Sequence, residues 1–320
     1  MKYRYHLLKY AGPATRFTCP SCGKPRCFTP YVDENDEPAD IKRYGICDHI
    51  NSCGYVSYPS SDYRKEICPA KNFVKTKASK SEVFKPTELC TIPEAIVKKS
   101  LDFADRNNFI TFLNRLFPQE AVQRVLSLYK IGTMWDTGTV WDGGTIFYEF
   151  DKTGRCRSGK IIRYNPETGH RIKDDRKPSV SWLHTSLLRS GELPQGWTLS
   201  QCLFGEHLLT LFPDKPVALV EAEKTAVICA AAFPDHIWLA TGGRQQFNDR
   251  LLVLKGRSVK VFPDIDAYPD WRRKAKGYAP LLHLEISPIL ERLATPEQRE
   301  AKIDIADLVV EVFTVYGKRP

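Results

Sequence analysis

Long hydrophobic runs are missing from this sequence. The longest uninterrupted apolar stretch is Ala226–Phe233, well short of the ~20 residues that a membrane helix requires. The segment Met1–His6 has no apolar core with a cleavage site behind it, so we expect no secretory signal. Internal repeats and long low-complexity tracts are also missing. These absences predict a cytoplasmic protein that has no membrane partner.

The composition is that of a globular protein. Hydrophobic residues make up 42% and aromatic residues 11% of the 320 residues, which excludes a wholly disordered chain. At about 100–200 residues per domain, this length predicts two domains or three small modules. The formal net charge of +9 is a weak indication of a polyanionic partner such as nucleic acid.

Half of the cysteines lie near the N-terminus. Five of the ten fall within the first 53 residues, and a disulfide framework is improbable in a cytoplasmic chain of this size. A C-x2-C pair followed by a C-x5-C pair is typical of a small β-unit that binds zinc in a tetrahedron of thiolates. The predicted zinc ligands are Cys19, Cys22, Cys47 and Cys53.

One alternative stays open at this predicted zinc site. His49 lies inside the second cysteine pair and could replace one of the thiolates. The glycines that follow Cys22 and Cys53 suit the turns of a four-cysteine site and favour that set. We expect Cys27 to pack in the small core instead of binding metal.

The expected domain boundaries follow changes in composition along the chain. They are 1–60 for the zinc ribbon, 61–88 for a basic linker, 89–214 for a helical and strand-rich basic region, and 215–320 for a parallel α/β domain. In the third region the patterns predict helices over 105–117 and 120–129, then strands over 145–150 and 159–164.

The last region alternates between strand and helix patterns. Apolar segments predict strands at 217–220, 237–240 and 258–262. Helical patterns follow them at 224–232, 246–254 and 271–284. This alternation predicts a parallel sheet, so the fold class is α/β with a β zinc ribbon in front of it.

Acidic residues follow two of these strands. Glu221 ends the first strand, and Asp264 and Asp266 end the third. Because α/β sheets build their sites at the carboxyl ends of parallel strands, we expect these side chains to meet. Side chains two residues apart on an extended segment point the same way, so Asp264 and Asp266 can face one cation. Asp304 and Asp307 lie downstream, and a helix cap in solvent is the alternative for any one of these acids.

Basic residues concentrate before the α/β region. Between positions 151 and 180 there are nine Lys and Arg residues against four acids, and a solvated charged hairpin is the alternative to a binding surface. The candidates for contact with phosphate are Lys160, Arg163, Arg171, Lys173 and, in the first turn of a predicted helix, Lys224.

These motifs together resemble a Toprim domain, the fold that bacterial and phage-type primases share with topoisomerases and related nucleases. The resemblance covers about 215–312 and depends on Glu221-Ala222-Glu223-Lys224, Thr241-Gly242-Gly243 and the Asp264-x-Asp266 strand end. A zinc ribbon and a basic, strand-rich region ahead of this domain resemble the primase layout. The segment Cys47–Tyr55 is similar to its counterpart in mobile elements of Bacteroidetes.

The resemblance implies a primase-type nucleotidyltransferase that makes short primers on single-stranded DNA from nucleoside triphosphates. It implies that Asp264 and Asp266 bind Mg or Mn, that Glu221 is a third ligand or general base, and that Asp304 and Asp307 act further out. The ribbon would read the template through four residues, Arg26, Tyr31, Arg43 and Tyr44.

Two other functions fit the same sequence. A Toprim nuclease would use the same acids to cleave phosphodiesters, and a non-catalytic zinc-ribbon protein would only bind single strands. Ala222 and Ala267 stand where the family pattern has glycine, which weakens the case for catalysis more than the case for the fold. No Gly-x4-Gly-Lys-Ser/Thr motif is present, so any helicase would be a separate partner.

Overall fold

The structure is a computed structural model, and the residues that it describes are 5–33, 35–38, 40–48, 55–57, 59, 89–135, 138–173, 179–194 and 196–316. The chain divides into two compact units, Met1–Phe84 and Lys85–Pro320. The predicted linker, 61–88, lies outside the described residues. No helix in the described part of the chain is both long enough and apolar enough to cross a bilayer.

The first unit contains one antiparallel sheet in the order β1-β2-β3-β4. Its strands are β1 (His6–Leu7), β2 (Phe28–Val32), β3 (Gly45–Cys47) and β4 (Val56–Ser57), and a 3-10 turn, η1 (Pro13–Thr15), follows β1. The core of this unit is small and consists mainly of Phe28 and three cysteine side chains. Gly45 is required by packing, because a Cβ there would stand 2.4 Å from the ring of Phe28.

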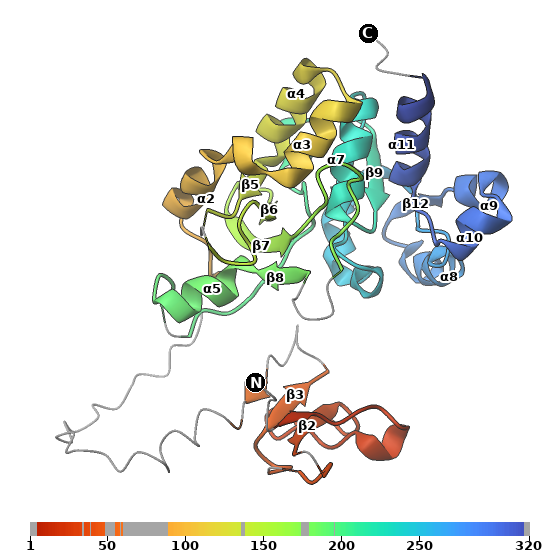
Figure 1. The fold of residues 1–320 in the computed structure, drawn as a ribbon. Coiled ribbons are helices and arrows are strands. Elements are labelled where there is room, and N and C mark those ends of the chain that lie inside the picture. Colours follow the sequence, from red (N-terminus) through yellow and green to blue (C-terminus); the bar gives the residue numbers. More distant parts are fainter. Residues whose placement is uncertain are drawn as a thin grey trace. The chain divides into compact units, whose positions relative to one another are not determined.

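The second unit begins with helices around an antiparallel sheet in the order β5-β6-β7-β8. The strands are β5 (Gly132–Thr133), β6 (Thr145–Phe150), β7 (Cys156–Ile162) and β8 (Val180–Trp182). The helices are α2 (Glu94–Leu101), η2 (Ala104–Arg106), α3 (Asn108–Leu116), α4 (Gln119–Tyr129) and α5 (Leu183–Ser190). Every residue of β6 is buried, because helices cover both faces of this sheet (Figure 1).

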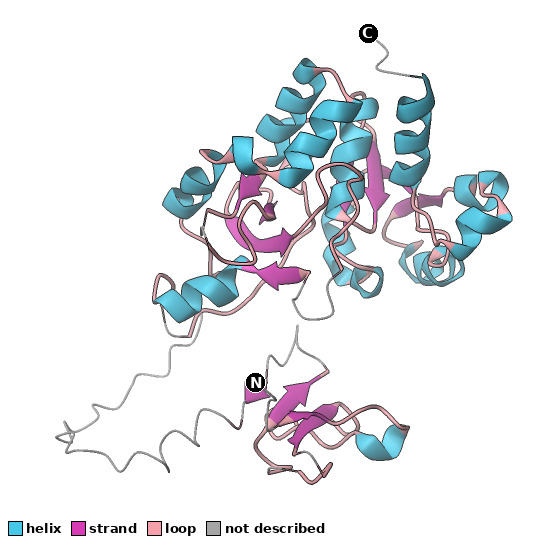
Figure 2. Cartoon of the chain, viewed as in Figure 1, coloured by secondary structure: helices cyan, strands magenta, loops and turns pink. Residues whose placement is uncertain are grey.

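The unit continues into a parallel sheet in the order β10-β9-β11-β12 (Figure 2). Its strands are β9 (Val217–Val220), β10 (Ile237–Ala240), β11 (Ser258–Val261) and β12 (His283–Ile286). The helical segments of this part are α6 (Leu208–Leu211), α7 (Glu223–Ala232), η3 (Arg244–Gln246), η4 (Asp249–Leu254), α8 (Tyr268–Tyr278), α9 (Ile289–Leu293), α10 (Pro296–Glu300) and α11 (Ile305–Tyr316). The predicted α/β class with a parallel sheet and a preceding ribbon is confirmed.

Four predicted elements differ in the structure by more than one residue. The predicted helix 105–117 is divided into η2 and α3, because the side chain of Asn107 caps α3. The predicted helix 271–284 ends as α8 at Tyr278, and its last residues belong instead to the edge strand β12, where exposed and half-buried positions alternate. The segment predicted as one helix over 246–254 is divided into two 3-10 turns, because Asn248 caps the second with its own side chain. The strand predicted over 159–164 is β7, which starts earlier and ends earlier.

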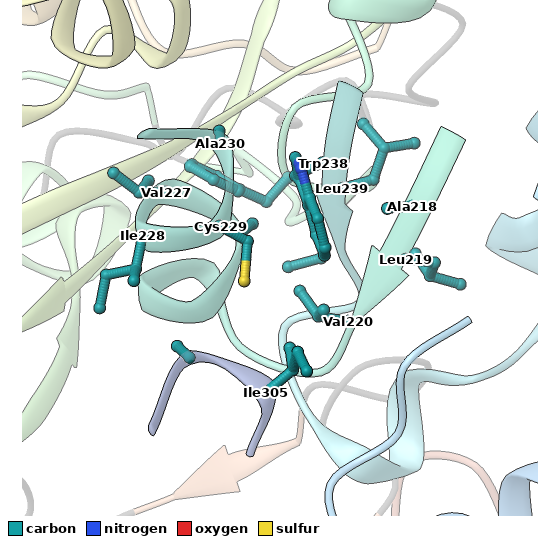
Figure 3. Packing of buried hydrophobic residues seen from close by; sticks show 14 of the residues in the cluster. Ala218, Leu219, Val220, Val227, Ile228, Cys229, Ala230, Trp238, Leu239 and Ile305 are labelled. Carbon is teal, nitrogen blue, oxygen red and sulfur yellow. The ribbon is translucent and has the colours of Figure 1, made fainter. Parts of the chain in front are cut away.

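Helix α7 is buried on nearly all sides, as its apolar sequence requires. It packs against the strands β9 and β10 on one side and against α4 and α11 on others. Figure 3 shows Cys229 of this helix pointing toward Val220 of β9 and Ile305 of α11, whereas Ile228 points away from them on the other side of the helix. One hydrophobic core therefore joins residues from both predicted regions, 89–214 and 215–320, and holds the first turn of α7 in place.

Candidate active site

The parallel sheet has its topological switch point between β9 and β11. The chain passes from β9 to β10 on one side and then returns to β11 on the other side of β9. In open α/β sheets, the crevice outside the carboxyl ends of two such strands is where ligands bind. Glu221 directly follows β9, and Asp264 lies three residues after the end of β11 at Val261.

Asp264 is the centre of a group of acids that we call the acidic cluster. Its Oδ1 atom is buried and has no hydrogen-bond partner among the described residues. Burial, and then the charges of four neighbouring carboxylates, raise the pKa of Asp264 to about 9. In decreasing order of influence these neighbours are Glu221, Asp304, Asp266 and Asp307. The five acids predicted from the sequence are thus electrostatic neighbours in the structure.

Two cations lie at the exposed side of the acidic cluster. The Oδ2 atom of Asp266 is 3.3 Å from Arg244 Nη1 and 3.5 Å from Lys302 Nζ. The carbonyl of Arg244 accepts a hydrogen bond of 3.1 Å from the indole of the buried Trp271. Burial raises the pKa of Glu221, the charge of Asp266 raises it further, and the backbone N–H of Arg244 opposes the shift.

Asp304 and Asp307 also stabilise the start of α11. The backbone N–H of Asp307 donates to Asp304 Oδ1 at 3.0 Å, and the N–H of Asp304 donates to Asp307 Oδ2 at 2.9 Å. This reciprocal pattern is a capping box, so the helix-cap alternative holds for both residues. The hydroxyl of Thr225 in α7 donates to Asp304 Oδ2 at 2.6 Å. The caps therefore orient both carboxylates while leaving them next to Asp264.

A second group of charges lies under the same strand ends, and we call it the paired charge cluster. Lys160 of β7 donates to both carboxylate oxygens of Glu223, at 3.2 and 3.1 Å, and to the carbonyl of Gly242 at 3.0 Å. The side chain of Lys160 is 14% exposed and that of Glu223 is 1% exposed. Lys160 therefore has internal partners, and we do not include it among the candidates for contact with phosphate.

The paired charge cluster includes a further buried acid that sequence reasoning missed. Glu149 of β6 accepts a hydrogen bond of 3.0 Å from Gln201, and its other carboxylate oxygen has no partner in the described part of the chain. Burial raises the pKa of Glu149 to about 8, against the opposing charge of Arg250. A single acid inside the apolar strand TIFYEF was the sequence signal for it.

Gly242 connects the two clusters. Its N–H donates to the carbonyl of Glu221 at 2.9 Å, while its own carbonyl accepts from Lys160. Its φ of 85° lies in the left-handed region, and a Cβ here would stand 3.3 Å from Glu223 Oε1. Both the turn and the close approach require glycine, and this contact fixes the backbone that carries Glu221.

Three of the remaining basic candidates follow β7, and the fourth, Lys224, lies in the first turn of α7. Arg163 is half-buried, and its Nη1 atom is buried without a partner among the described residues. Arg171 and Lys173 are exposed. Arg155 and Arg157 both form ion pairs with Asp151, and the solvated-hairpin alternative fits only Arg155, because Arg157 is buried. Burial opposes the effect, but hydrogen bonds from Thr153 and from both arginines hold the pKa of Asp151 well below its usual value.

Three of the predicted zinc ligands converge in the first unit. The Sγ atoms of Cys19, Cys22 and Cys47 all lie within 4.8 Å of one another, and the last two are 4.0 Å apart. With a Zn–S bond of about 2.3 Å, the edge of a tetrahedron of thiolates is ~3.8 Å, so this arrangement fits zinc. The fourth predicted ligand, Cys53, and the alternative, His49, lie outside the described residues.

Other side chains of the ribbon also have defined places. Cys27 is buried, and its Sγ atom is 3.8 Å from that of Cys47. Among the predicted template contacts, the guanidinium of Arg43 lies over the ring of Tyr44, 5.1 Å from its centroid. Tyr31 lies in β2, and Arg26 is exposed with a φ of 56°.

Two family models match this chain. Residues 3–68 match a family described as a zinc beta-ribbon finger, and residues 107–265 match one described as "Domain of unknown function (DUF6371)". The chain therefore carries a zinc ribbon, in agreement with the cysteine cluster. None of the curated proteins matches the chain.

Several solved structures of primases are similar to this one. The primase fragment of the bacteriophage T7 primase-helicase is 11% identical, covers 93% of this chain and 95% of its own, and gives a TM-score of 0.38. The RNA polymerase domain of Mycobacterium tuberculosis primase DnaG is 10% identical over 69% of this chain and 80% of its own, with a TM-score of 0.42. The zinc-binding and RNA polymerase domains of the Aquifex aeolicus primase are 15% identical over 97% and 84%, with a TM-score of 0.32. At these TM-scores the likeness carries no argument about the site, so the proposals below depend on its geometry.

Proposed function

We propose that this chain is a cytoplasmic, metal-dependent primase-type nucleotidyltransferase that makes short primers on single-stranded DNA for a mobile element or phage-like replicon. The observation that carries the proposal is the environment of Asp264. Its buried oxygen has no partner among the described residues, and four other carboxylates surround it at the switch point of a parallel sheet. Such a group of like charges is tolerated only where a cation or a proton offsets it.

The donor set of the acidic cluster fits Mg²⁺ or Mn²⁺. All of its groups are carboxylate oxygens, which are the ligands that these hard cations prefer. Asp264 and Asp266 would hold the metal, with Glu221 as a third ligand or as the base, and Asp304 and Asp307 further out. A metal bound there supplies charge stabilisation for the triphosphate and activation of the attacking 3′-hydroxyl. Gly242 and Arg244 position this constellation through their contacts with Glu221 and Asp266.

The other parts of the chain have roles in this proposal too. Arg163, Arg171 and Lys173 are the proposed contacts for phosphates of the template, because their charges are exposed or lack a partner among the described residues. The ribbon, with structural zinc on Cys19, Cys22, Cys47 and Cys53, is proposed to hold the template. A helicase is a further proposed partner.

The test is synthesis of labelled product on single-stranded DNA in Mg²⁺ and in Mn²⁺, with wild type and Asp264→Asn. We expect the variant to lose product formation to below one-hundredth of wild type while it stays folded. Its melting temperature in metal-free buffer should change little at neutral pH, where the raised pKa keeps Asp264 protonated, and should rise above pH 9, where the variant removes a repelling charge. Asp270→Asn is the matched control, since Asp270 lies on α8 and pairs with Lys274 outside the acidic cluster.

Each outcome for wild type identifies one function. Cleavage of single strands without synthesis assigns the acidic cluster to a nuclease. Binding of single strands with neither reaction makes the chain a non-catalytic binding protein. Equal synthesis by wild type and Asp264→Asn contradicts the assigned site.

A further inference from the structure

A groove of about 660 Å³ lies between α2, the end of α4 and the turn that joins β6 to β7, and we call it the α2–α4 groove. None of the residues in its described lining belongs to the acidic cluster or to the paired charge cluster. Figure 1 shows α2 on the opposite side of the second unit from α8, α9 and α10. The groove is therefore separate from the proposed active site.

The floor of the α2–α4 groove is apolar. Val97 and Phe150 line it from buried positions, and Leu126 of α4 is half-buried beside them. The wall before α2 is fixed to the sheet, because the N–H of Ile92 donates to the carbonyl of Cys156 at 2.8 Å. A wall that is already ordered loses little conformational entropy when a ligand binds, which favours binding.

Cations surround this floor on three elements. Lys98 lies on α2, Lys130 directly follows α4, and Arg155 lies in the turn between β6 and β7. All three side chains are exposed. Glu94 is the only acid in the described lining, so cations outnumber acids around the groove. An anionic partner therefore complements this rim.

The acidic partners of two of these cations leave the rim positive. Lys98 pairs with Glu94 at 2.9 Å, but the two side chains are 71% and 79% exposed, and such a surface pair contributes little. Arg155 shares Asp151 with Arg157, so a single carboxylate faces two guanidinium groups.

Lys130 has a backbone conformation that ordinarily belongs to glycine. Its φ is 50°, in the left-handed region, at the C-terminus of α4. It makes no ion pair with another described residue, and its Nζ atom lies 4.6 Å from the centroid of the Phe150 ring. Because a lysine is less stable than glycine in this conformation, its presence here indicates a use for the charge.

Two other occupants fit the groove less well. Phe150 is the only aromatic residue in the described lining, and it is 4% exposed with the ammonium group of Lys130 over its ring, so it offers no platform for stacking a base. The predicted linker, 61–88, ends three residues before Thr91 of the wall, but its net charge has the same sign as the rim. A segment with carboxylates and an aliphatic side chain matches both the rim and the floor.

We propose that the α2–α4 groove docks a short acidic segment of a partner protein. An aliphatic side chain of this segment lies on the apolar floor, and its carboxylates lie beside Lys98, Lys130 and Arg155. Docking here leaves the acidic cluster open, so the partner and the substrates of the proposed reaction bind at the same time. The proposal goes beyond the function proposed above, because it concerns a surface that the chemistry does not use.

The experiment measures equilibrium binding to the full chain of a labelled synthetic peptide in which leucines alternate with aspartates. Replacing the aspartates by serine, or the leucines by serine, should weaken binding at least tenfold. Lys130→Gly should also weaken it at least tenfold without lowering the melting temperature, because glycine favours the left-handed conformation. Lys276→Met, on α8 outside the groove, is the control and should bind the peptide as wild type does.

Ser127 allows a test in which the charge has either sign. It is exposed in the lining of the groove near the end of α4, so substitution there leaves the core intact. Ser127→Glu should weaken binding of the peptide at least threefold, and Ser127→Lys should strengthen it at least threefold. Equal binding by the two variants overturns the proposal.

The remaining outcomes assign the groove to something else. Equal affinity for the peptide that has serine in place of leucine means that surface charge alone binds it. Displacement of the peptide by single-stranded DNA assigns the groove to the template, and displacement by a peptide of residues 61–88 assigns it to the linker. Each of these results, like the absence of binding by wild type, overturns the proposal. The synthesis test above decides separately on the proposed function.

Discussion

Glu221 and Glu223 are two residues apart in sequence but belong to two clusters, one made of like charges and the other of paired opposite charges. Glu223 is 1% exposed and receives two hydrogen bonds from Lys160, inside the paired charge cluster. Glu221 faces Asp264 and Asp266, inside the acidic cluster, with Arg244 beside it. Glu223 is therefore neutralised by a lysine within the fold. Glu221 lies among other carboxylates, and we propose that a bound cation offsets their charges.

The difference follows from the cost of removing charge from water. A buried acid with a well-placed lysine is stable as it stands, because the pair attracts across a short distance in a medium of low dielectric constant. Converging carboxylates repel one another, so they lower the stability of the folded state until a cation or proton is present. The contrast between the two clusters supports the proposal that the acidic cluster binds a metal ion.

The largest expected effect extends the comparison to thiolates, which also converge in this chain. Cys47→Ser should abolish zinc binding and unfold the first unit, because apparent binding free energies of ~10–16 kcal/mol are folding free energy in such sites. Cys27→Ser is the control, since its Sγ atom is only 3.8 Å from that of Cys47. Metal analysis of the two purified variants is the measurement. Loss of zinc from Cys27→Ser would make Cys27 a ligand.

The next effect tests the paired charge cluster. Lys160→Met should lower the free energy of unfolding by about 3–5 kcal/mol, because it leaves Glu223 buried without its partner. Adding Glu223→Gln should recover part of this loss. The matched control is Lys260→Met, which removes the exposed pair with Glu285 and should cost about 0–1 kcal/mol. Denaturant unfolding of all three proteins is the measurement, and equal small losses would remove the distinction between the two kinds of charge.

The last effect, and the smallest for a change of one pH unit, is a pH dependence to which Glu149 contributes. Its pKa is raised from an ordinary 4.5 to about 8, so between these values the folded state holds a proton that the unfolded state has released. The free energy of unfolding should therefore fall as the pH rises from 4.5 to 8, by at most about 1.4 kcal/mol per pH unit. Glu149→Gln should reduce this slope, and the part that remains comes from the other buried acids with raised pKa values, chiefly Asp264.

Magnesium serves as the control for this pH experiment. It should leave the contribution of Glu149 unchanged, because that residue lies in the paired charge cluster, and it should stabilise only through the acidic cluster. The measurement is denaturant unfolding at several pH values with and without Mg²⁺. A slope that Glu149→Gln does not change would mean that Glu149 is ionised in the folded state.

The strand ends that carry the acidic cluster could be predicted from the sequence, because short apolar runs between helical patterns identify buried parallel strands. The predicted strands at 217–220 and 237–240 have the same bounds as β9 and β10. The edge strand β12 was missed, since its alternating pattern directly follows the helical sequence of α8. Local pattern alone does not reveal where an edge strand interrupts a helical run.

The partners of charged residues were much harder to predict from the sequence. Lys160 and Glu223 are 63 residues apart, and nothing local distinguishes this lysine from the exposed basic residues that follow it. Its pairing depends on how β7 packs beside the first turn of α7, which is a property of the tertiary structure. Arg155 and Arg157 share a partner, Asp151, that lies close to both in sequence. The local sequence does not show, however, that Asp151 and Arg157 are buried.

The acids of the cluster come from three segments, after β9, after β11 and at the start of α11, which the sheet and the packing of α11 on α7 bring together. The sequence between them can lengthen by insertion at surface loops at little thermodynamic cost, because the closure entropy of a loop grows slowly with its length. Motif spacing is then a poor guide to relatives of this chain, since drift in loop length leaves the geometry intact. A search that aligns strand ends, allowing any gap between Glu221, Asp264 and Asp304, is better matched to how this site is built.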